Sequence, residues 1–217
     1  MNTQVKETVK KITPSWMIRL ARSIVTRYRY WKSQRYVGRL LETENNICLE
    51  IGAEKKRSGW HTLDINPYCD ICWDLMKGLP FPDNSVQKIY SSHVLEHFSY
   101  SDLIKLLKEC LRVLAPKGTF SVCIPDASIY ISAYVNGRDL DPEQFPLYEV
   151  AFHGNSKIDY VNYIAYMDGH HKHMFDEDNI LSILRNVGFS SCRSRDFDAA
   201  LDLDERKHES IYAIAEK

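Results

Sequence analysis

The sequence has no apolar run long enough to suggest a membrane-spanning segment. Such a segment needs roughly 20 apolar residues, and no stretch approaches that length. No secretory signal is recognisable at the N-terminus. The six cysteines mostly lie inside apolar runs, where cysteines usually act as small buried hydrophobic residues. We therefore expect a cytoplasmic protein with reduced thiols.

The sequence also offers little for a metal or redox site made of cysteines. Cys69 and Cys72 form a C-x-x-C, but no second pair follows it. Two strand cysteines on opposite faces of a sheet are therefore the favoured interpretation. Internal repeats and low-complexity segments are absent as well. A chain of 217 residues with this composition fits one main domain, predicted here over residues 43–217, with an appendage at residues 1–42.

Acidic residues are nearly absent from the first 40 positions. These positions carry ten lysines and arginines against the single acid Glu7, although the whole chain has a net charge of −1. Apolar residues recur there at helical spacing, at Trp16, Leu20, Ile24, Tyr28 and Trp31. The pattern predicts a basic amphipathic arm with one or two helices over residues 15–41.

The partner of this arm has three candidate identities. Amphipathic helices most often pack against their own domain or a second copy of the chain, and we favour that interpretation. Basic residues beside tryptophan and isoleucine are also typical of a helix on an anionic membrane surface, so peripheral membrane contact stays open. Nucleic acid is not an expected partner, because no nucleic-acid-binding motif accompanies the aromatic residues.

From Ile47 onward, strand and helix patterns alternate. Strands are predicted at Ile47–Ile51, His61–Ile65, Cys69–Trp73, Val86–Ser92, Thr119–Ile124, Ser190–Phe197 and Ser210–Ala215. Helices are predicted from Ser99 or Ser101 to Leu114 and over Asp176–Val187. The alternation indicates an α/β fold with a mostly parallel sheet and helices on both faces. Only nine residues separate Ile51 from His61, so a loop or a single turn should replace the first crossover helix.

A tyrosine-rich segment at about residues 127–174 interrupts this pattern. It has few long aliphatic residues and ends in the sequence GHHKH. Long and partly irregular segments of this kind are often functional, so we expect an inserted lid. Tyrosines with an apolar face and a polar tip suit a sugar or aromatic acceptor, although about half of them should merely pack the insert.

Polar residues follow the predicted strands at their C-terminal ends. Glu50 and Gly52 follow the first strand, Asp64 the second, Asp74 the third and Ser92 the fourth. In an open parallel sheet this edge is where ligands bind. Carboxylates there can accept hydrogen bonds from ribose hydroxyls or an adenine amino group, and no phosphate-binding loop accompanies them. The pattern therefore indicates a nucleoside site.

These motifs, in this order, resemble the class I S-adenosylmethionine-dependent methyltransferases. Residues 46–126 carry the resemblance through LEIGA, TLDIN, DLMKGLPFPDNSVQKIYSSHVLEHF and LRVLAPKGTFSVCIPD. A later segment, GHHKHMFDEDNILSILRNVGF, resembles methyltransferases of sugar and surface-polysaccharide pathways. The resemblance implies a Rossmann-like, doubly wound fold whose seven-stranded sheet is mostly parallel with an antiparallel last strand.

The resemblance also implies S-adenosylmethionine as the cofactor. Asp64 would bind the ribose, with Ile65 beneath the adenine. Asp74 and the Leu75 backbone would meet the adenine ring. Glu50, Gly52 and Ser92 would form the site of the methionine end. The activity implied is methyl transfer to a small-molecule or glycan acceptor, and we expect the methyl group to go to a hydroxyl.

A hydroxyl acceptor must lose its proton, and histidine suits that task near neutral pH. His93 follows the fourth strand at the expected methyl-bearing end, and His173 lies at the end of the insert. These two are the candidate catalytic residues. For His97 we favour a structural role, in which the side chain only caps or hydrogen-bonds the start of the next helix. No metal is expected.

Two alternatives follow from the same motifs. The first motif reads Gly52-Ala53-Glu54-Lys55-Lys56 in place of the usual glycine-rich run, which fits a non-catalytic binding protein with a degenerate cofactor loop. The sequence HVLEH also matches the H-x-x-E-H of inverted zinc peptidases, a remote alternative because that motif needs a continuous helix. A variant of this alternative is a methyltransferase that binds a divalent metal near Glu96 and His97. Some quinone O-methyltransferases resemble this segment and use its acid and histidine in that way.

Overall fold

The computed structural model of the protein describes residues 14–217, so residues 1–13 of the predicted arm lie outside the described residues. Seven strands form one sheet in the order β3-β2-β1-β4-β5-β7-β6. They are β1 (Cys48–Ile51), β2 (His61–Asp64), β3 (Ile71–Cys72), β4 (Val86–Ser92), β5 (Leu114–Pro125), β6 (Ser190–Ser194) and β7 (Ser210–Glu216). β1 to β5 run parallel to one another, and β7 runs antiparallel to both β5 and β6. The predicted fold class, including the antiparallel last strand, is confirmed.

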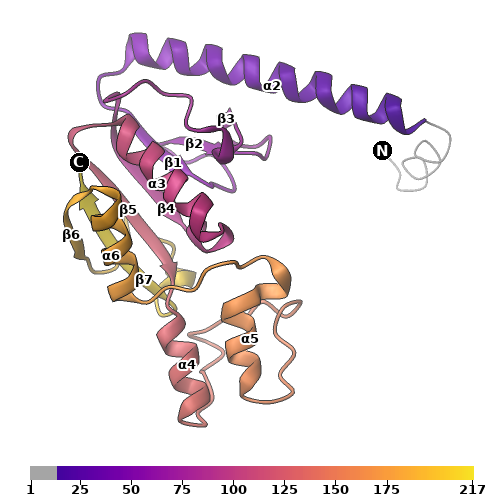
Figure 1. The fold of residues 1–217 in the computed structure, drawn as a ribbon, viewed down its shortest axis with the longest axis vertical. Coiled ribbons are helices and arrows are strands. Elements are labelled where there is room, and N and C mark those ends of the chain that lie inside the picture. Colours follow the sequence, from indigo (N-terminus) through magenta and orange to yellow (C-terminus); the bar gives the residue numbers. More distant parts are fainter. Residues whose placement is uncertain (1–13) are drawn as a thin grey trace.

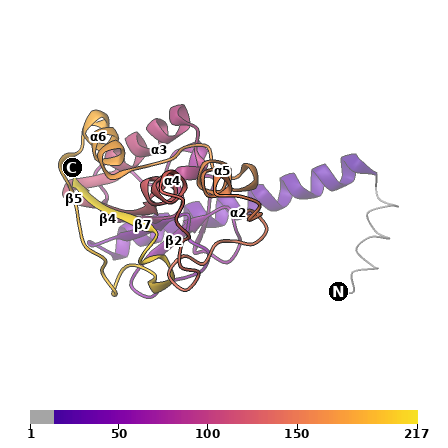
Figure 2. The ribbon, with the colours of Figure 1, turned by 90° about the horizontal axis from the view of Figure 1, so that it is seen from below.

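Five α-helices and four short 3-10 helices accompany the sheet in the described part of the chain. The α-helices are α2 (Ser15–Thr43), α3 (Tyr100–Val113), α4 (Ala127–Val135), α5 (Ile158–Tyr166) and α6 (Glu177–Val187). The 3-10 helices are η1 (Leu75–Lys77), η2 (Leu95–His97), η3 (Met167–Gly169) and η4 (Asp204–Arg206). α3 and α6 lie side by side against the sheet (Figures 1 and 2).

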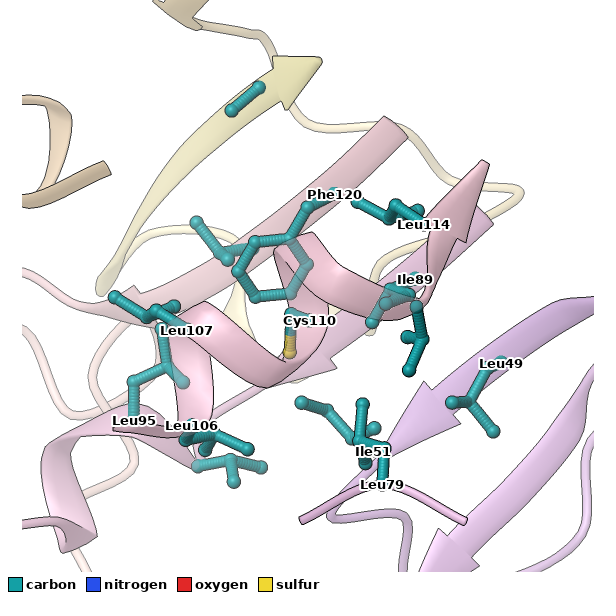
Figure 3. Packing of buried hydrophobic residues seen from close by; sticks show 14 of the residues in the cluster. Leu49, Ile51, Leu79, Ile89, Leu95, Leu106, Leu107, Cys110, Leu114 and Phe120 are labelled. Atoms are coloured by element: carbon teal, nitrogen blue, oxygen red, sulfur yellow. The ribbon is translucent and has the colours of Figure 1, made fainter. Parts of the chain in front are cut away.

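The main hydrophobic core lies between the sheet and α3 and α6. Figure 3 shows Leu106, Leu107 and Cys110 of α3 beside Ile89 of β4 and Phe120 of β5. All five side chains are at most 1% exposed. Burying each large apolar side chain contributes about 1.5–3 kcal/mol, so this layer fixes the strands whose ends carry the polar residues.

Loops take the place of the helices that were expected on the second face of the sheet. A smaller cluster there contains Tyr90, Cys123 and Tyr212, and loop residues such as Trp60 and Phe197 pack against it. The first crossover, residues 52–60, contains no helix, as its length predicted. Because a chain this short cannot form a helix and still return to a parallel strand, this face had to be covered by loops.

Both edge strands are shorter than predicted, and beside β3 a side chain replaces part of the ladder. β3 covers Ile71–Cys72 and not Cys69–Trp73. The Asp70 carboxylate accepts hydrogen bonds from Thr62 N (3.2 Å) and Thr62 Oγ1 (2.9 Å), where a longer strand would have paired. At the other edge β6 ends at Ser194 and not at Phe197.

The two halves of α2 have different surroundings. In the C-terminal half, Val37 and Leu40 are buried in the main core, and the Tyr36 hydroxyl is hydrogen-bonded to His61 Nδ1 (2.9 Å). In the N-terminal half the predicted apolar residues, Trp16 to Trp31, are each 51–61% exposed. This half extends beyond the rest of the domain (Figure 1). The favoured docking against the protein's own domain therefore applies to the C-terminal half alone.

The insert forms a second, smaller core of its own. Tyr130, Tyr160 and Tyr163 are buried there with residues of α4 and α5. Figure 1 shows α4 and α5 together beyond one end of the sheet. By contrast, Tyr148 and Tyr166 are exposed. The tyrosines thus divide between packing and surface.

Candidate functional site

The polar strand ends meet where the strand order of the sheet reverses. β1 and β4 are neighbours, and from them the sheet grows toward β2 and β3 on one side and toward β5 on the other. Ligands of open α/β sheets bind outside the carboxyl ends of the strands at such a point. Two cavities are found there, and both are lined by Gly52 and His93.

The first of these, the Asp64 cavity, has a volume of about 450 Å³. Its lining consists of Gly52, Asp64, Ile65, Trp73, Asp74, Leu75, His93, Val94, His97 and Phe98. Four of the predicted cofactor residues, from strands two and three, therefore face one cavity. Ile65 is 68% exposed, although its side chain is large and apolar, and Leu75 is buried.

Asp64 and Asp74 are held in the same way. Asp64 Oδ1 accepts a hydrogen bond from Asn66 N (2.8 Å), and Asp74 Oδ1 accepts one from Met76 N (3.0 Å). Each carboxylate thus fixes the turn that follows its strand through one oxygen. The other oxygen, Oδ2, has no hydrogen bond to any residue that the structure describes. Two fixed carboxylates with a spare acceptor each suit a ligand with hydroxyl or amino donors.

The second cavity, the Glu50 cavity, has a volume of about 200 Å³. It is lined by Glu50, Gly52, Ala53, Glu54, Lys55, Lys56, Arg57, Tyr90, Ser92, His93, Leu203 and Arg206. Arg57 Nη1 lies 3.4 Å from Glu50 Oε2. Burial raises the pKa of the Glu50 carboxyl, and the Arg57 guanidinium opposes that shift. The cavity therefore contains an acid and basic groups in close proximity.

Arg206 is a site residue that the sequence did not indicate. Its Nη1 donates hydrogen bonds to the Ser92 carbonyl (3.0 Å) and to Ser92 Oγ (2.8 Å). Arg57 is a second such residue, and its Nη2 donates to the carbonyls of Ala200 and Leu201. Arg57 thus connects the end of β1 to the loop before β7, and Arg206, which lies in that loop, contacts the end of β4. No local motif marks these contacts, because the partners lie more than a hundred positions apart.

Gly52 is required by the fold at the meeting point of the cavities. Its φ of +71° is a left-handed conformation that favours glycine, and its N–H donates to the Leu63 carbonyl (2.8 Å). A Cβ at this position would also overlap the Val94 side chain. The sequence predicts that a ligand comes close to the backbone at this glycine. In the structure the Val94 side chain also comes close to Gly52.

The unusual residues of the first motif do not fill the site. The Glu54 side chain is 86% exposed, and its carboxylate lies 3.8 Å from Arg206 Nη2. Lys55 and Lys56 are exposed, and Lys56 is paired with Asp70 (2.9 Å). Ala53 is the buried residue of the motif, and its carbonyl accepts hydrogen bonds from Asn66 Nδ2 and Cys69 Sγ. The motif lines the rim of the Glu50 cavity.

His93 lies at the boundary of the two cavities. Its Nε2 is hydrogen-bonded to Ser210 Oγ (2.8 Å), and its Nδ1 lies 4.0 Å from Glu209 Oε1. Burial lowers the pKa of His93 well below the usual value, and the charge of Arg206 adds to the shift. The ring is therefore neutral at physiological pH, which is the form that can accept a proton.

His173 lines neither cavity. Its ring packs against Phe175 (4.6 Å between centroids) and Tyr100 (5.9 Å), and its Nε2 is hydrogen-bonded to Asn179 (3.2 Å). No residue of the insert lines either cavity, so its tyrosines do not face them. The geometry thus favours His93 over His173 as a group near a ligand.

The HVLEH segment does not form one helix. β4 ends at Ser92, His93 has a positive φ of +51°, and η2 begins only at Leu95. The zinc-peptidase alternative requires both histidines on one face of a helix. His93 and His97 do not meet this requirement, because His93 lies outside η2. Glu96 is buried, and this burial raises its pKa to about 8.

Comparison with known proteins adds a family match to this geometry. A family model described as a methyltransferase domain matches residues 38–122, which include the carboxyl ends of β1 to β4. A comparison with curated proteins found no match. The matched part contains all the predicted cofactor residues and ends before the insert.

Two solved structures share the fold. A SAM-dependent methyltransferase from Archaeoglobus fulgidus is 16% identical, with a TM-score of 0.51, over 100% of this chain and 100% of that chain. A protein from Thermotoga maritima, described as a SAM-dependent methyltransferase and possible histamine N-methyltransferase, is 16% identical, with a TM-score of 0.50, over 89% of this chain and 92% of that one. Residues 38–122 thus match a methyltransferase domain, and the chain shares its fold with two proteins described as SAM-dependent methyltransferases.

Proposed function

We propose that this chain transfers a methyl group from S-adenosylmethionine to a hydroxyl of a small-molecule or saccharide acceptor. The observation that carries the proposal is the pairing of Asp64 and Asp74 in one cavity, each with one carboxylate oxygen unused by any described residue. A ribose diol and an adenine amino group are donors that match two such acceptors. The cofactor carries no phosphate, so the site needs no glycine-rich phosphate cradle.

The remaining contacts divide between the two cavities. In the Asp64 cavity, Ile65 offers an exposed apolar face for the adenine, with Leu75 buried next to Asp74. In the Glu50 cavity, the Glu50 carboxylate suits the ammonium of the methionine end, and Arg206 suits its carboxylate. The two cavities meet at Gly52, so one ligand can span them.

His93 is the proposed base. When bound, the cofactor supplies a methyl group that its sulfonium already activates. The protein's task is to align the acceptor and to remove its proton. His93 is neutral and lies where the cavities meet. Its Nε2, which is hydrogen-bonded to Ser210 Oγ, would take the acceptor's proton once that hydroxyl turns away, and the Glu209 carboxylate beside Nδ1 can stabilise the protonated ring. We expect His93→Gln to bind cofactor normally and to lose methyl transfer.

A saccharide intermediate of a surface-polysaccharide pathway is the proposed acceptor. The resemblance of residues 169–189 to methyltransferases of such pathways supports it. Incubation with methyl-labelled S-adenosylmethionine and a panel of nucleotide sugars and lipid-linked saccharides tests the assignment. Label in a methyl ether supports it, and label transferred to amines alone contradicts it.

Calorimetry with S-adenosylhomocysteine tests the core of the proposal. We expect binding in the micromolar range, weakened by Asp64→Ala by about 1.5–3 kcal/mol, which is roughly 10- to 150-fold. Asp83→Asn is the matched control, because that carboxylate is exposed and pairs with Arg112 outside both cavities. No heat at millimolar ligand would favour the non-catalytic binding protein.

For the arm, we propose peripheral contact with an anionic membrane surface. The exposed residues Trp16, Leu20 and Ile24 alternate with arginines, a composition suited to the lipid interface. No helix among residues 14–217 has the length and apolarity to cross a bilayer, so the contact would be superficial. Flotation with phosphatidylserine vesicles should retain the wild type and lose the W16S/L20S/I24S variant. Equal flotation of both would contradict the proposal, and concentration-dependent dimerisation lost in the variant would indicate self-association instead.

A further inference from the structure

Three potential metal ligands converge between the site and the insert. Glu96 and His97 belong to η2, directly beyond β4, and His171 follows η3 in the insert. One ligand atom from each of the three lies within 4.8 Å of the other two. Glu96 and His171 are buried, and His97 also lines the Asp64 cavity. The group therefore joins two parts of the chain that the sequence keeps more than 70 positions apart.

The two imidazoles are oriented by backbone carbonyls. His97 Nδ1 lies 3.0 Å from the His170 carbonyl, and His171 Nδ1 lies 2.8 Å from the Ile164 carbonyl. A carbonyl oxygen only accepts, so each Nδ1 carries the hydrogen and donates it. In the neutral ring Nε2 then carries the lone pair. Metal-binding histidines are held in this way, with the other ring nitrogen donating to a carbonyl or carboxylate.

Glu96 supplies the carboxyl member of the group. It is 2% exposed, and its Oε2 has no hydrogen-bond partner among residues 14–217. Its Oε1 lies 3.8 Å from His97 Nε2. No lysine or arginine of the described chain forms an ion pair with it. A cation bound between the buried Glu96 carboxyl and the two imidazole lone pairs would satisfy all three groups at once.

We propose that Glu96, His97 and His171 bind one divalent transition-metal ion, with Zn²⁺ as the ion that this donor set suits best. Two imidazoles and one carboxylate are a common zinc ligand set, with a fourth position open to water. Tetrahedral coordination with bonds of about 2.0–2.1 Å places ligand atoms roughly 3.4 Å apart, so the side chains must close by about an ångström on binding. The set differs from the zinc-peptidase motif, since His171 from the insert takes the place of His93.

The proposed ion would fasten the insert to the edge of the Asp64 cavity. The backbone already joins these parts, because Lys172 N and His173 N donate to the Glu96 carbonyl (2.8 and 3.2 Å). An ion would add three bonds at the same junction and fix the His97 ring that lines the cavity. The metal site needs no bound cofactor, so metal binding can be tested independently of methyl transfer.

Cobalt titration of the full-length protein after EDTA treatment and removal of the chelator tests the site. We expect one equivalent of Co²⁺ to bind, with the visible absorption of a four-coordinate site, and one equivalent of Zn²⁺ to displace it. Glu96→Gln and His171→Gln should each weaken binding by about ten-fold or more. His170→Ala is the matched control, because that exposed neighbour contributes only its backbone carbonyl and should leave the titration unchanged.

The variants also separate the metal from a structural role. Circular dichroism checks that each variant is folded, and Glu96→Gln keeps the shape of the side chain if His171→Gln does not fold. Zn²⁺ should raise the melting temperature of the wild type and of His170→Ala, but not that of Glu96→Gln. Absence of Co²⁺ binding by folded wild type at millimolar metal would overturn the proposal. So would binding that Glu96→Gln leaves unchanged.

Discussion

The two cavities that meet at Gly52 are assembled in different ways. In the Asp64 cavity the carboxylates are held by hydrogen bonds to backbone amides two positions later, at Asn66 and Met76. In the Glu50 cavity, Arg206 reaches Ser92 across 114 positions, and Arg57 reaches Leu201 across 144. The first cavity is therefore a property of the strand ends themselves, whereas the second exists only once the C-terminal loop has packed.

This difference gives the two cavities separable effects on a ligand. S-adenosylhomocysteine has an adenosine part and an amino-acid part, whereas 5′-methylthioadenosine lacks the amino-acid part. Residues of the Asp64 cavity should affect both compounds, and residues of the Glu50 cavity should affect S-adenosylhomocysteine alone.

The largest effect is expected at Gly52, which the cavities share. Gly52→Ala forces a left-handed conformation that costs about 1–2 kcal/mol and a clash with Val94 that costs about 1–3 kcal/mol more. Urea unfolding should therefore show a loss of roughly 2–5 kcal/mol. Gly59→Ala is the control, because Gly59 has the same positive φ with open space around it. Equal losses in the two variants would mean that the Val94 contact contributes nothing.

The next effect is expected at Arg206. Arg206→Met should weaken the binding of S-adenosylhomocysteine by about 1.5 kcal/mol, roughly ten-fold, because a charge-assisted hydrogen bond to the ligand carboxylate is lost. Binding of 5′-methylthioadenosine should not change. Lys207→Met is the control, since Lys207 lies over Phe197 and not in the cavity. If calorimetry shows that the binding of both ligands is weakened equally, Arg206 supports the fold and does not bind the amino-acid part of the ligand.

Glu50 should give a smaller and pH-dependent effect. Glu50→Gln removes the anionic partner of the ligand ammonium and should cost about 0.5–1.5 kcal/mol at neutral pH. Burial raises the Glu50 pKa, while Arg57 and Arg206 oppose the shift. The charged form binds the ammonium, so wild-type affinity should fall as the pH drops through this raised pKa. The variant should show a flatter profile by calorimetry, and identical profiles would exclude this role for Glu50.

The smallest effect is expected at the exposed rim. Glu54→Ala and Lys55→Ala should each change the affinity for S-adenosylhomocysteine by less than about 0.5 kcal/mol, because both side chains are solvated. A larger gain in affinity would show that these residues obstruct the tail, as a degenerate cofactor loop would require.

The same contrast explains what the sequence could predict. Strand ends, the order of elements and the carboxylates Asp64 and Asp74 follow from local patterns, and the structure places both residues in one cavity. Arg57, Arg206 and Glu209 carry no local signal, because their contacts depend on how a loop folds over the second face. The position of His173 was unpredictable for a similar reason, since its ring also packs against Tyr100, which lies at the start of α3 and far away in the sequence.

A structure of the protein in complex with S-adenosylhomocysteine would decide whether one ligand spans the two cavities. We expect the ribose hydroxyls on Asp64, the adenine amino group on Asp74 and the amino-acid end between Glu50 and Arg206. A ligand bound outside the two cavities, or with its adenosine in the Glu50 cavity, would contradict this expectation.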